Sequence, residues 1–160
     1  MYQFRIEMMN GDIMEGELYP DVAPITVANF VSLCESHFYQ GLIFHRVIPG
    51  FMIQGGGMDA RKQQKPAKSI KGEFAANGVK NDLRHTRGVI SMARTMIPDS
   101  ASSQFFIMHQ DAPHLDGQYA AFGKVTSGLD VVDAIANVRT GFMDCPVEDV
   151  VIKDITIINK

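Results

Sequence analysis

The chain has 160 residues, which suits one domain with a substantial buried core. Its net charge of −3 argues against general affinity for nucleic acid, and no apolar run has the length of a membrane-spanning helix. Cys34 and Cys145 form neither a disulfide framework nor a metal-ligand spacing, and Met1–Arg5 enters a strand pattern without the features of a signal peptide. We therefore expect a cytoplasmic protein with a single domain over residues 1–160.

The first predicted element is a β-hairpin. Side chains alternate over Tyr2–Met9, and Asp12–Leu18 returns in the antiparallel direction. Asn10-Gly11 lies between the two runs, and these residues tolerate the positive φ angles of a tight hairpin turn.

A helix is predicted from Pro24 to about His37. Proline lacks an N–H group and therefore suits the first helical turn. Apolar residues then recur every three or four positions, as one buried helix face requires: Val27, Phe30, Val31 and Cys34. Cys34 is expected to be a small buried hydrophobic residue of this face.

The run Phe44–Gly57 places one permanent cation, Arg46, and one amide, Gln54, among apolar side chains. The arginine is either held by a carboxylate as part of the fold or directed into a pocket. Strand alternation puts Phe44, Arg46 and Ile48 on one face. A turn at Pro49-Gly50 would let Arg46 meet Gln54 across a hairpin. The glycines at 55–57 would allow another backbone or a ligand to come close.

The stretch from Gly57 to Arg87 shows little periodicity and is long for a loop, so we expect it to be pinned against the body or functional. Within it, Arg61–Lys71 carries five basic residues and no acidic residue. This charge pattern is typical of a solvated loop, and the alternative is a contact surface for an acidic partner.

The remaining elements are short strands and a second helix. The helix is predicted to begin near Ser127–Asp130, with Ser127 as its N-cap and an inner stripe of Leu129, Val132, Ile135 and Ala136. The strands are expected at 43–48, 52–55, 89–93, 104–109, 121–125 and 147–158. Many alternating strands with two helices indicate a mainly β protein built as an antiparallel barrel with helices over its ends.

The Phe44–Gly57 run resembles the signature of the cyclophilins, the peptidyl-prolyl cis-trans isomerases. The resemblance continues through Arg87–Arg94, Ser100–Ile107, His114–Gly117 and Phe122–Val125, and it therefore covers a whole domain. It implies a closed eight-stranded antiparallel barrel capped by two helices. It also implies an isomerase that needs no cofactor or metal and acts on proline-containing peptides and on unfolded or flexible protein segments. We expect a monomer, although the sequence leaves the oligomeric state open.

The resemblance also implies the site. Arg46 would donate a hydrogen bond to the prolyl nitrogen of the twisted amide, because a guanidinium stays protonated and presents several N–H groups in a fixed fork. Gln54 and Phe51 complete the implied catalytic group. The positions implied to bind the peptide are Met52, Ala93, Gln104, Phe106, His114, Leu115 and Tyr119.

Two positions depart from the family pattern. Tyr119 stands where many cyclophilins carry histidine, and His114 stands where many carry tryptophan. An imidazole offers less apolar area than an indole. We therefore expect turnover of proline peptides to be kept and binding of the macrocycle cyclosporin to be weakened.

Two other functions remain open from the sequence. One is a non-catalytic module on the same fold that binds proline peptides or acts as a chaperone, although the presence of Arg46, Phe51, Gln54 and Phe106 favours catalysis. The other is a hydrolase that pairs a serine or cysteine with one of the five histidines. Neither cysteine lies in a recognisable nucleophile turn, and the spacings of His45, His85 and His109 show no metal-site pattern.

Overall fold

A single eight-stranded sheet forms the body of the protein, as seen in a computed structural model that describes residues 2–160. All its strand pairs are antiparallel, and the strand order is β3-β4-β6-β5-β7-β2-β1-β8. The strands are β1 (Tyr2–Met8), β2 (Ile13–Leu18), β3 (Leu42–Ile48), β4 (Met52–Asp59), β5 (Val89–Met92), β6 (Phe105–Met108), β7 (Ala121–Ser127) and β8 (Ile152–Asn159).

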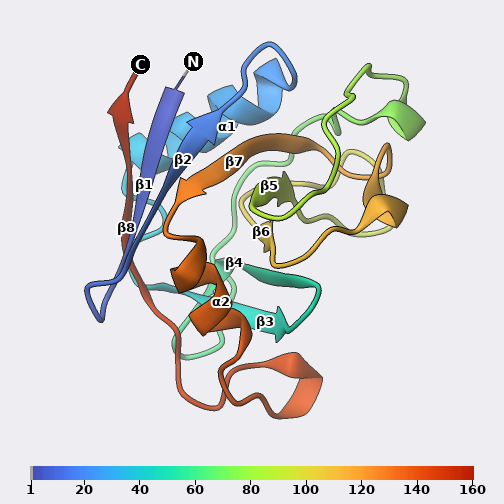
Figure 1. Cartoon of the computed structure of the whole chain (residues 1–160). Coiled ribbons are helices and arrows are strands. Elements are labelled where there is room, and N and C mark those ends of the chain that lie inside the picture. The colour runs from blue at the N-terminus through green and yellow to red at the C-terminus, as the bar shows by residue number, and fades with distance from the viewer. Residues whose placement is uncertain (1) are drawn as a thin grey trace.

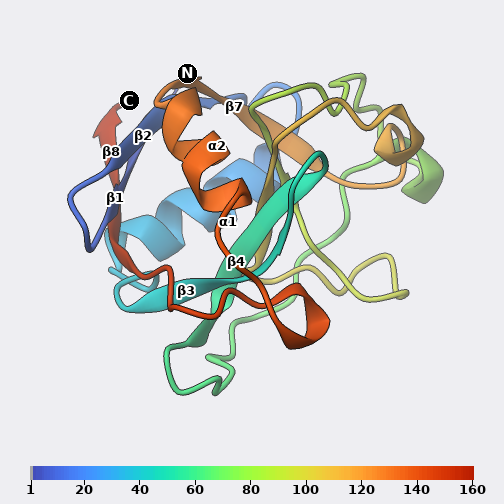
Figure 2. The same cartoon turned by 60° about the horizontal axis from the view of Figure 1, so that its bottom comes forward.

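Two α-helices accompany the sheet, α1 (Pro24–Glu35) and α2 (Leu129–Ala136). The sheet curls around the core, with α1 toward the top of the view in Figure 1 and α2 toward the bottom. Figure 2 shows α2 in front of α1 when the lower end is turned forward. The expectation of a mainly β, eight-stranded antiparallel architecture with two helices is confirmed. Among residues 2–160, no helix has both the length and the apolar character needed to cross a membrane.

The curled sheet is only partly closed, so the expected closed barrel overstates the structure. The edge strands β3 and β8 meet through one isolated bridge, Ile43 with Val151. Two backbone hydrogen bonds flank it, from Gly41 N to Ile152 O (2.9 Å) and from Phe44 N to Val150 O (3.0 Å). Beyond this point β3 pairs with β4 and β8 pairs with β1. The expected last strand over 147–158 therefore begins five residues later than predicted, because 147–151 forms this irregular edge.

The main core is built around Phe30 of α1. Its ring lies 5.2 to 6.2 Å, between centroids, from the rings of Phe4, Tyr39, Phe105 and Phe122, which come from the sheet and from the segment after α1. The predicted helix face is confirmed, since its four apolar residues are all buried. A second, smaller cluster of buried apolar residues lies on the opposite face of the sheet, with Met52, Phe106 and Leu115 among its members.

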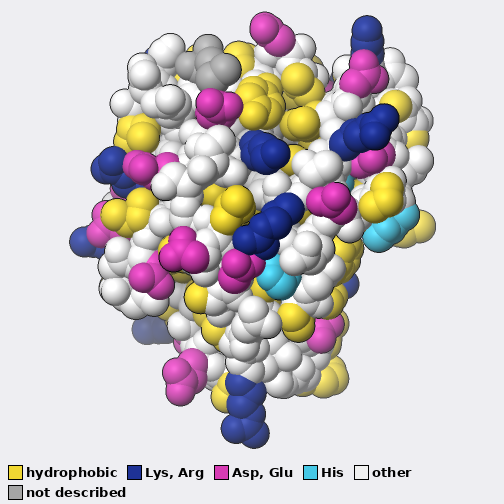
Figure 3. Space-filling model, in the orientation of Figure 1, with side chains coloured by type: hydrophobic (Ala, Val, Ile, Leu, Met, Phe, Trp, Pro, Cys, Tyr) yellow, Lys and Arg dark blue, Asp and Glu magenta, His cyan; other side chains and the backbone are white. Residues whose placement is uncertain are grey.

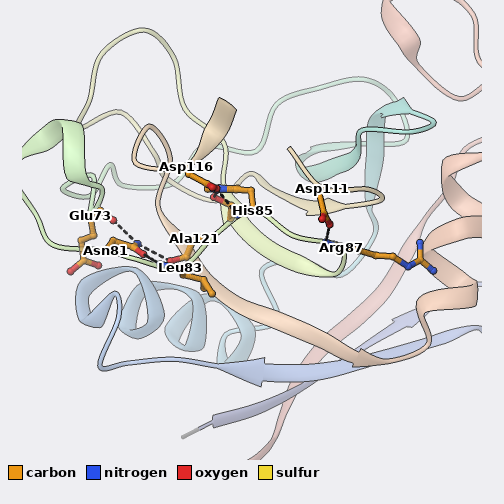
Figure 4. Close-up of polar contacts among 9 residues, drawn as sticks. Glu73, Asn81, Leu83, His85, Arg87, Asp111, Asp116 and Ala121 are labelled. Carbon is orange, nitrogen blue, oxygen red and sulfur yellow. Dashed lines mark hydrogen bonds and ion pairs between the residues drawn. The ribbon is translucent and has the colours of Figure 1, made fainter. Parts of the chain in front are cut away.

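The long segment after β4 is pinned by buried polar groups. Glu73 is only 3% exposed and accepts hydrogen bonds from Thr26 N (2.6 Å) and Thr26 Oγ1 (2.7 Å) in the first turn of α1. Asn81 donates to the carbonyls of Glu73 and Ala121, each at 2.9 Å (Figure 4). Glu73 thereby acts as the N-terminal cap of α1, whose own N-cap residue, Ala23, has no side-chain acceptor. The expectation of a pinned segment is confirmed.

Basic residues of the same segment also attach to the body. Lys62 Nζ lies 2.6 Å from Asp149 Oδ1, and Lys65 Nζ donates to Phe38 O at 2.7 Å while lying over the Phe38 ring. Both lysines are exposed, as in the solvated loop that the charge pattern favoured.

The start of α2 corrects one prediction. Ser127 is the last residue of β7 and does not cap the helix. The N-cap position is taken by Gly128 at φ 88°, and a Cβ there would collide with the carbonyl oxygen of Ile13. Close passage of β2 therefore selects glycine at the position where a capping side chain would otherwise lie.

Candidate active site

The β3–β4 hairpin brings Arg46 beside Gln54, as the turn at Pro49-Gly50 predicted. The two residues pair directly across the strands, and Arg46 Nη1 donates to Gln54 Oε1 at 3.3 Å. Gln54 Nε2 in turn donates to Gln104 Oε1 at 3.0 Å. This row of side chains runs from the exposed guanidinium into the sheet.

A bulge in β3 overturns the predicted alternation of Phe44 with Arg46. Phe44 pairs with Gly55 while Arg46 pairs with the adjacent Gln54, so β3 has one residue more than β4 at this point. Phe44 and Val47 therefore both enter the main core, and Arg46 is directed to the other side. Re-aiming one side chain is a common consequence of a bulge, and here it places the arginine at a pocket.

That pocket has a volume of about 130 Å³ and is mainly hydrophobic in its lining residues. Phe106 and Met52 lie on adjacent strands, and Leu115 follows from the 3₁₀ helix η2 (Pro113–Leu115). Eight of the ten predicted site residues line it: Arg46, Phe51, Met52, Gln54, Ala93, Phe106, Leu115 and Tyr119. Arg94 is a further lining residue that sequence reasoning missed.

The other two predicted site residues lie next to the lining. Gln104 reaches the pocket through its bond to Gln54, and a Cβ on Gly57 would occupy the place of its side chain. The glycine therefore makes room for Gln104. His114 is exposed and stacks on Phe51, with ring centroids 5.9 Å apart.

A buried histidine supports the pocket from behind. The ring of His85 stacks on Phe106 at 5.9 Å with an interplanar angle of 18°. Its Nδ1 lies 3.1 Å from Asp116 Oδ1 (Figure 4), and its Nε2 lies 2.9 Å from Ser91 Oγ. Burial lowers the pKa of His85, and the hydrogen bond to Asp116 opposes this change. Sequence reasoning missed this group because its three members come from separate segments.

The same group bears on the hydrolase alternative, because serine, histidine and aspartate in a row form the usual acyl-transfer triad. Ser91 is 0% exposed and does not line the pocket, so no substrate carbonyl can reach its hydroxyl. The arrangement therefore holds Phe106 in place and offers no accessible nucleophile.

A second histidine fixes the hairpin turn. Gly50 N donates to His109 Nδ1 at 2.8 Å, so the proton of the neutral ring lies on Nε2, which is 3.0 Å from Asp133 Oδ1 of α2. Arg87 holds both oxygens of Asp133, at 2.6 and 2.9 Å. In addition, His109 N donates to Phe51 O at 2.9 Å. Asp133 of α2 and His109, which directly follows β6, together thus hold the turn that carries Phe51.

Residues 3–157 match the family model for cyclophilin type peptidyl-prolyl cis-trans isomerases. The chain belongs to the cyclophilin family. Over 133 residues it is 53% identical to a peptidyl-prolyl cis-trans isomerase of Acinetobacter baylyi, covering 79% of this chain and 68% of that protein. It is also 45% identical over 160 residues to peptidyl-prolyl cis-trans isomerase B of Escherichia coli, covering 92% and 94%.

Solved cyclophilin structures share the fold. A cyclophilin of Cryptosporidium parvum, crystallised in the presence of the dipeptide Ala-Pro, superposes with a TM-score of 0.83 at 30% identity and covers 99% of each chain. Within residues 2–160 of this cyclophilin, no three His, Cys, Asp or Glu residues are placed to hold a metal ion.

The His109 contacts lead to a prediction for this cyclophilin. In His109→Asn the amide oxygen can replace Nδ1 as acceptor for Gly50 N, whereas in His109→Gln the polar group reaches toward Asp133 instead. Losing a hydrogen bond of about 0.5–1.5 kcal/mol at the turn should lower kcat/KM of the glutamine variant about two- to tenfold, mainly by raising KM. The asparagine variant should stay within about twofold of wild type. Isomerisation kinetics of both variants test this, and equal losses in the two would contradict the role given to Nδ1.

Proposed function

We propose that this cyclophilin isomerises X-Pro bonds by seating the proline ring in the 130 Å³ pocket and donating a hydrogen bond from Arg46 to the prolyl nitrogen. The observation that carries the proposal is the position of Arg46 at the pocket without a carboxylate partner. Its guanidinium lies at an apolar pocket, makes one side-chain hydrogen bond, to Gln54, and has no carboxylate partner among residues 2–160. The sequence left open an arginine held by a carboxylate as part of the fold, and the described residues provide no such partner.

The chemistry needs no nucleophile, because rotation about the amide breaks no σ bond. The barrier of about 18–20 kcal/mol comes from loss of conjugation, which leaves a lone pair on the prolyl nitrogen. A charge-assisted hydrogen bond to that lone pair is worth about 1.5–3 kcal/mol. An acceleration of about 10⁵ requires about 7 kcal/mol, so the remainder is assigned to orientation of the peptide and to the low polarity of the pocket.

The neighbouring side chains have separate tasks in this proposal. Phe51, Met52, Phe106 and Leu115 enclose the proline ring. Gln54 orients Arg46 and, with Ala93, Gln104 and Tyr119, contacts the peptide backbone. The Ala-Pro dipeptide present with the Cryptosporidium parvum relative supports a proline peptide as ligand.

We also propose that the chain acts as one monomeric domain on unfolded or flexible protein segments, without a cofactor, in the cytoplasm. The two unpaired thiols, Cys34 and Cys145, support a reducing compartment. Burial raises the pKa of the Cys34 thiol far above its usual range, so this cysteine stays a neutral core residue.

One experiment separates catalysis from the alternative of a non-catalytic binding module. Exchange NMR on an Ala-Pro peptide at a substoichiometric amount of the protein measures cis-trans interconversion directly. Exchange that is faster than the uncatalysed rate, which has a time constant of tens to hundreds of seconds, supports the enzyme. Chemical-shift changes without faster exchange would support the binding module.

His114 allows the position of the groove to be tested with cyclosporin. His114→Trp should strengthen cyclosporin inhibition about five- to thirtyfold, because an extra ~40–80 Å² of buried apolar area is worth about 1–2 kcal/mol. Turnover of a short X-Pro peptide should change much less, since His114 lies outside the pocket lining. Inhibition constants and turnover are measured side by side in the two proteins. Identical inhibition constants would exclude His114 from the macrocycle-binding surface.

A further inference from the structure

A second arginine lies at the pocket and has no role in the mechanism above. Arg94 follows β5, and its guanidinium carbon is 4.6 Å from the ring centroid of Phe74 and 4.7 Å from that of Tyr119. Its Nη1 donates to Thr95 O (2.9 Å) and its Nη2 to Gln118 O (2.6 Å). These contacts fix the cation between two rings at the edge of the pocket.

The charge of Arg94 is not neutralised locally. Its hydrogen bonds go to neutral carbonyls, its Nε is buried without a partner, and it makes no ion pair among residues 2–160. The carboxylates of neighbouring segments accept hydrogen bonds from groups other than Arg94. Glu73 accepts from Thr26, Asp99 accepts from Gly72 and Asn77, and Asp116 lies within hydrogen-bond distance of His85.

The pocket therefore differs in its charge from the face of the molecule that Figure 3 shows. Acidic and basic side chains are interspersed over the face in Figure 3. The pocket lining, in contrast, contains Arg46 and Arg94 and no aspartate or glutamate. Arg94, which is held in place by its contacts, and Arg46, which is exposed, together give this site a positive potential that attracts a nearby anion.

We propose that Arg94 is a specificity-determining residue, whose charge makes the site prefer proline peptides with a glutamate or aspartate directly before or after the proline. This rests on the proposed isomerase function. The contact with Tyr119 adds a positioning effect: the flat guanidinium holds the ring of Tyr119, which lies edge-on to Phe106 with centroids 5.6 Å apart. The charge of Arg94 changes the preference between peptides, whereas its stacking on Tyr119 changes the binding of all peptides equally.

Two variants separate the two effects. Arg94→Lys keeps the charge and loses the planar stacking group, while Arg94→Gln loses both. The substrates are two series of otherwise identical peptides with Glu, Gln or Lys before or after the proline. Exchange NMR gives kcat/KM, and titration gives Kd for the same peptides.

In wild type at low salt we expect kcat/KM for the better Glu peptide to exceed that of its Lys counterpart about fivefold. High salt should reduce this ratio, since it screens exposed charges. Arg94→Lys should keep most of this ratio but weaken the binding of all peptides. Arg94→Gln should reduce the ratio to about twofold, which is the preference expected from the charge of Arg46 alone.

Equal values for Glu and Lys peptides in wild type, or an unchanged ratio in a folded Arg94→Gln, would overturn the proposal. If no peptide is turned over, the isomerase function fails instead. In that case the ratio of Kd values for the Glu and Lys peptides still decides whether Arg94 selects acidic sequences.

Discussion

Arg46→Ala should lower kcat/KM for X-Pro isomerisation by about 10- to 150-fold. This is the rate equivalent of losing a charge-assisted hydrogen bond worth about 1.5–3 kcal/mol in the transition state. The loss should fall on kcat, because the prolyl nitrogen accepts the bond only when the amide is twisted. Exchange NMR under saturating peptide measures kcat directly.

Arg46→Lys is the matched variant for this test. It keeps a positive charge but replaces the planar fork of N–H groups by a point charge on a flexible chain, so we expect it to recover little of the lost rate. Both variants should unfold at the wild-type urea concentration, because Arg46 is exposed and makes one long hydrogen bond. Wild-type turnover in a folded Arg46→Ala protein would refute the proposed mechanism.

Glu73→Ala should lower the free energy of unfolding by about 3–5 kcal/mol. The substitution leaves the Thr26 N–H and hydroxyl without partners in the first turn of α1, and each buried unsatisfied group costs about 1–3 kcal/mol. It also opens a cavity where the 3% exposed side chain lay. Urea unfolding followed by circular dichroism gives the difference.

Glu73→Gln is the control, since its amide oxygen can still accept a hydrogen bond from Thr26. We expect a loss of about 1–2 kcal/mol, which reflects the weaker bond to a neutral acceptor. Equal stability of the alanine variant and wild type would mean that α1 needs no cap from the long segment.

Local signals carried most of the fold prediction. Asn10-Gly11 identified the first hairpin, and the spacing of Val27, Phe30 and Val31 identified α1 with its buried face. The pairing of Arg46 with Gln54 was also predictable, because the length of the turn at Pro49-Gly50 sets the register of the hairpin.

The errors and omissions involve contacts between distant segments. Alternation within β3 could not show the bulge between Phe44 and Arg46, which depends on its pairing with β4. Glu73, Asn81 and His85 look like ordinary polar loop residues in the sequence, and their partners lie on other elements. Arg94 was missed as a site residue because its place between two rings depends on where η2 and the long segment pack.

The position of β1 has a consequence for how this protein is made. β1 lies between β2 and β8, and Gln3 pairs with Asn159, so the ends of the described chain lie side by side (Figure 1). On the ribosome, the β1–β2 hairpin emerges before the other strands of the sheet, and the outer edge of β1 lacks its partner until β8 has been synthesised. Unpaired strand edges template aggregation, and pairings distant in sequence form slowly. A nascent chain of this isomerase therefore carries an open sheet edge while the segments from β2 to β8 are synthesised, and that edge stays available to other chains until β8 pairs with it.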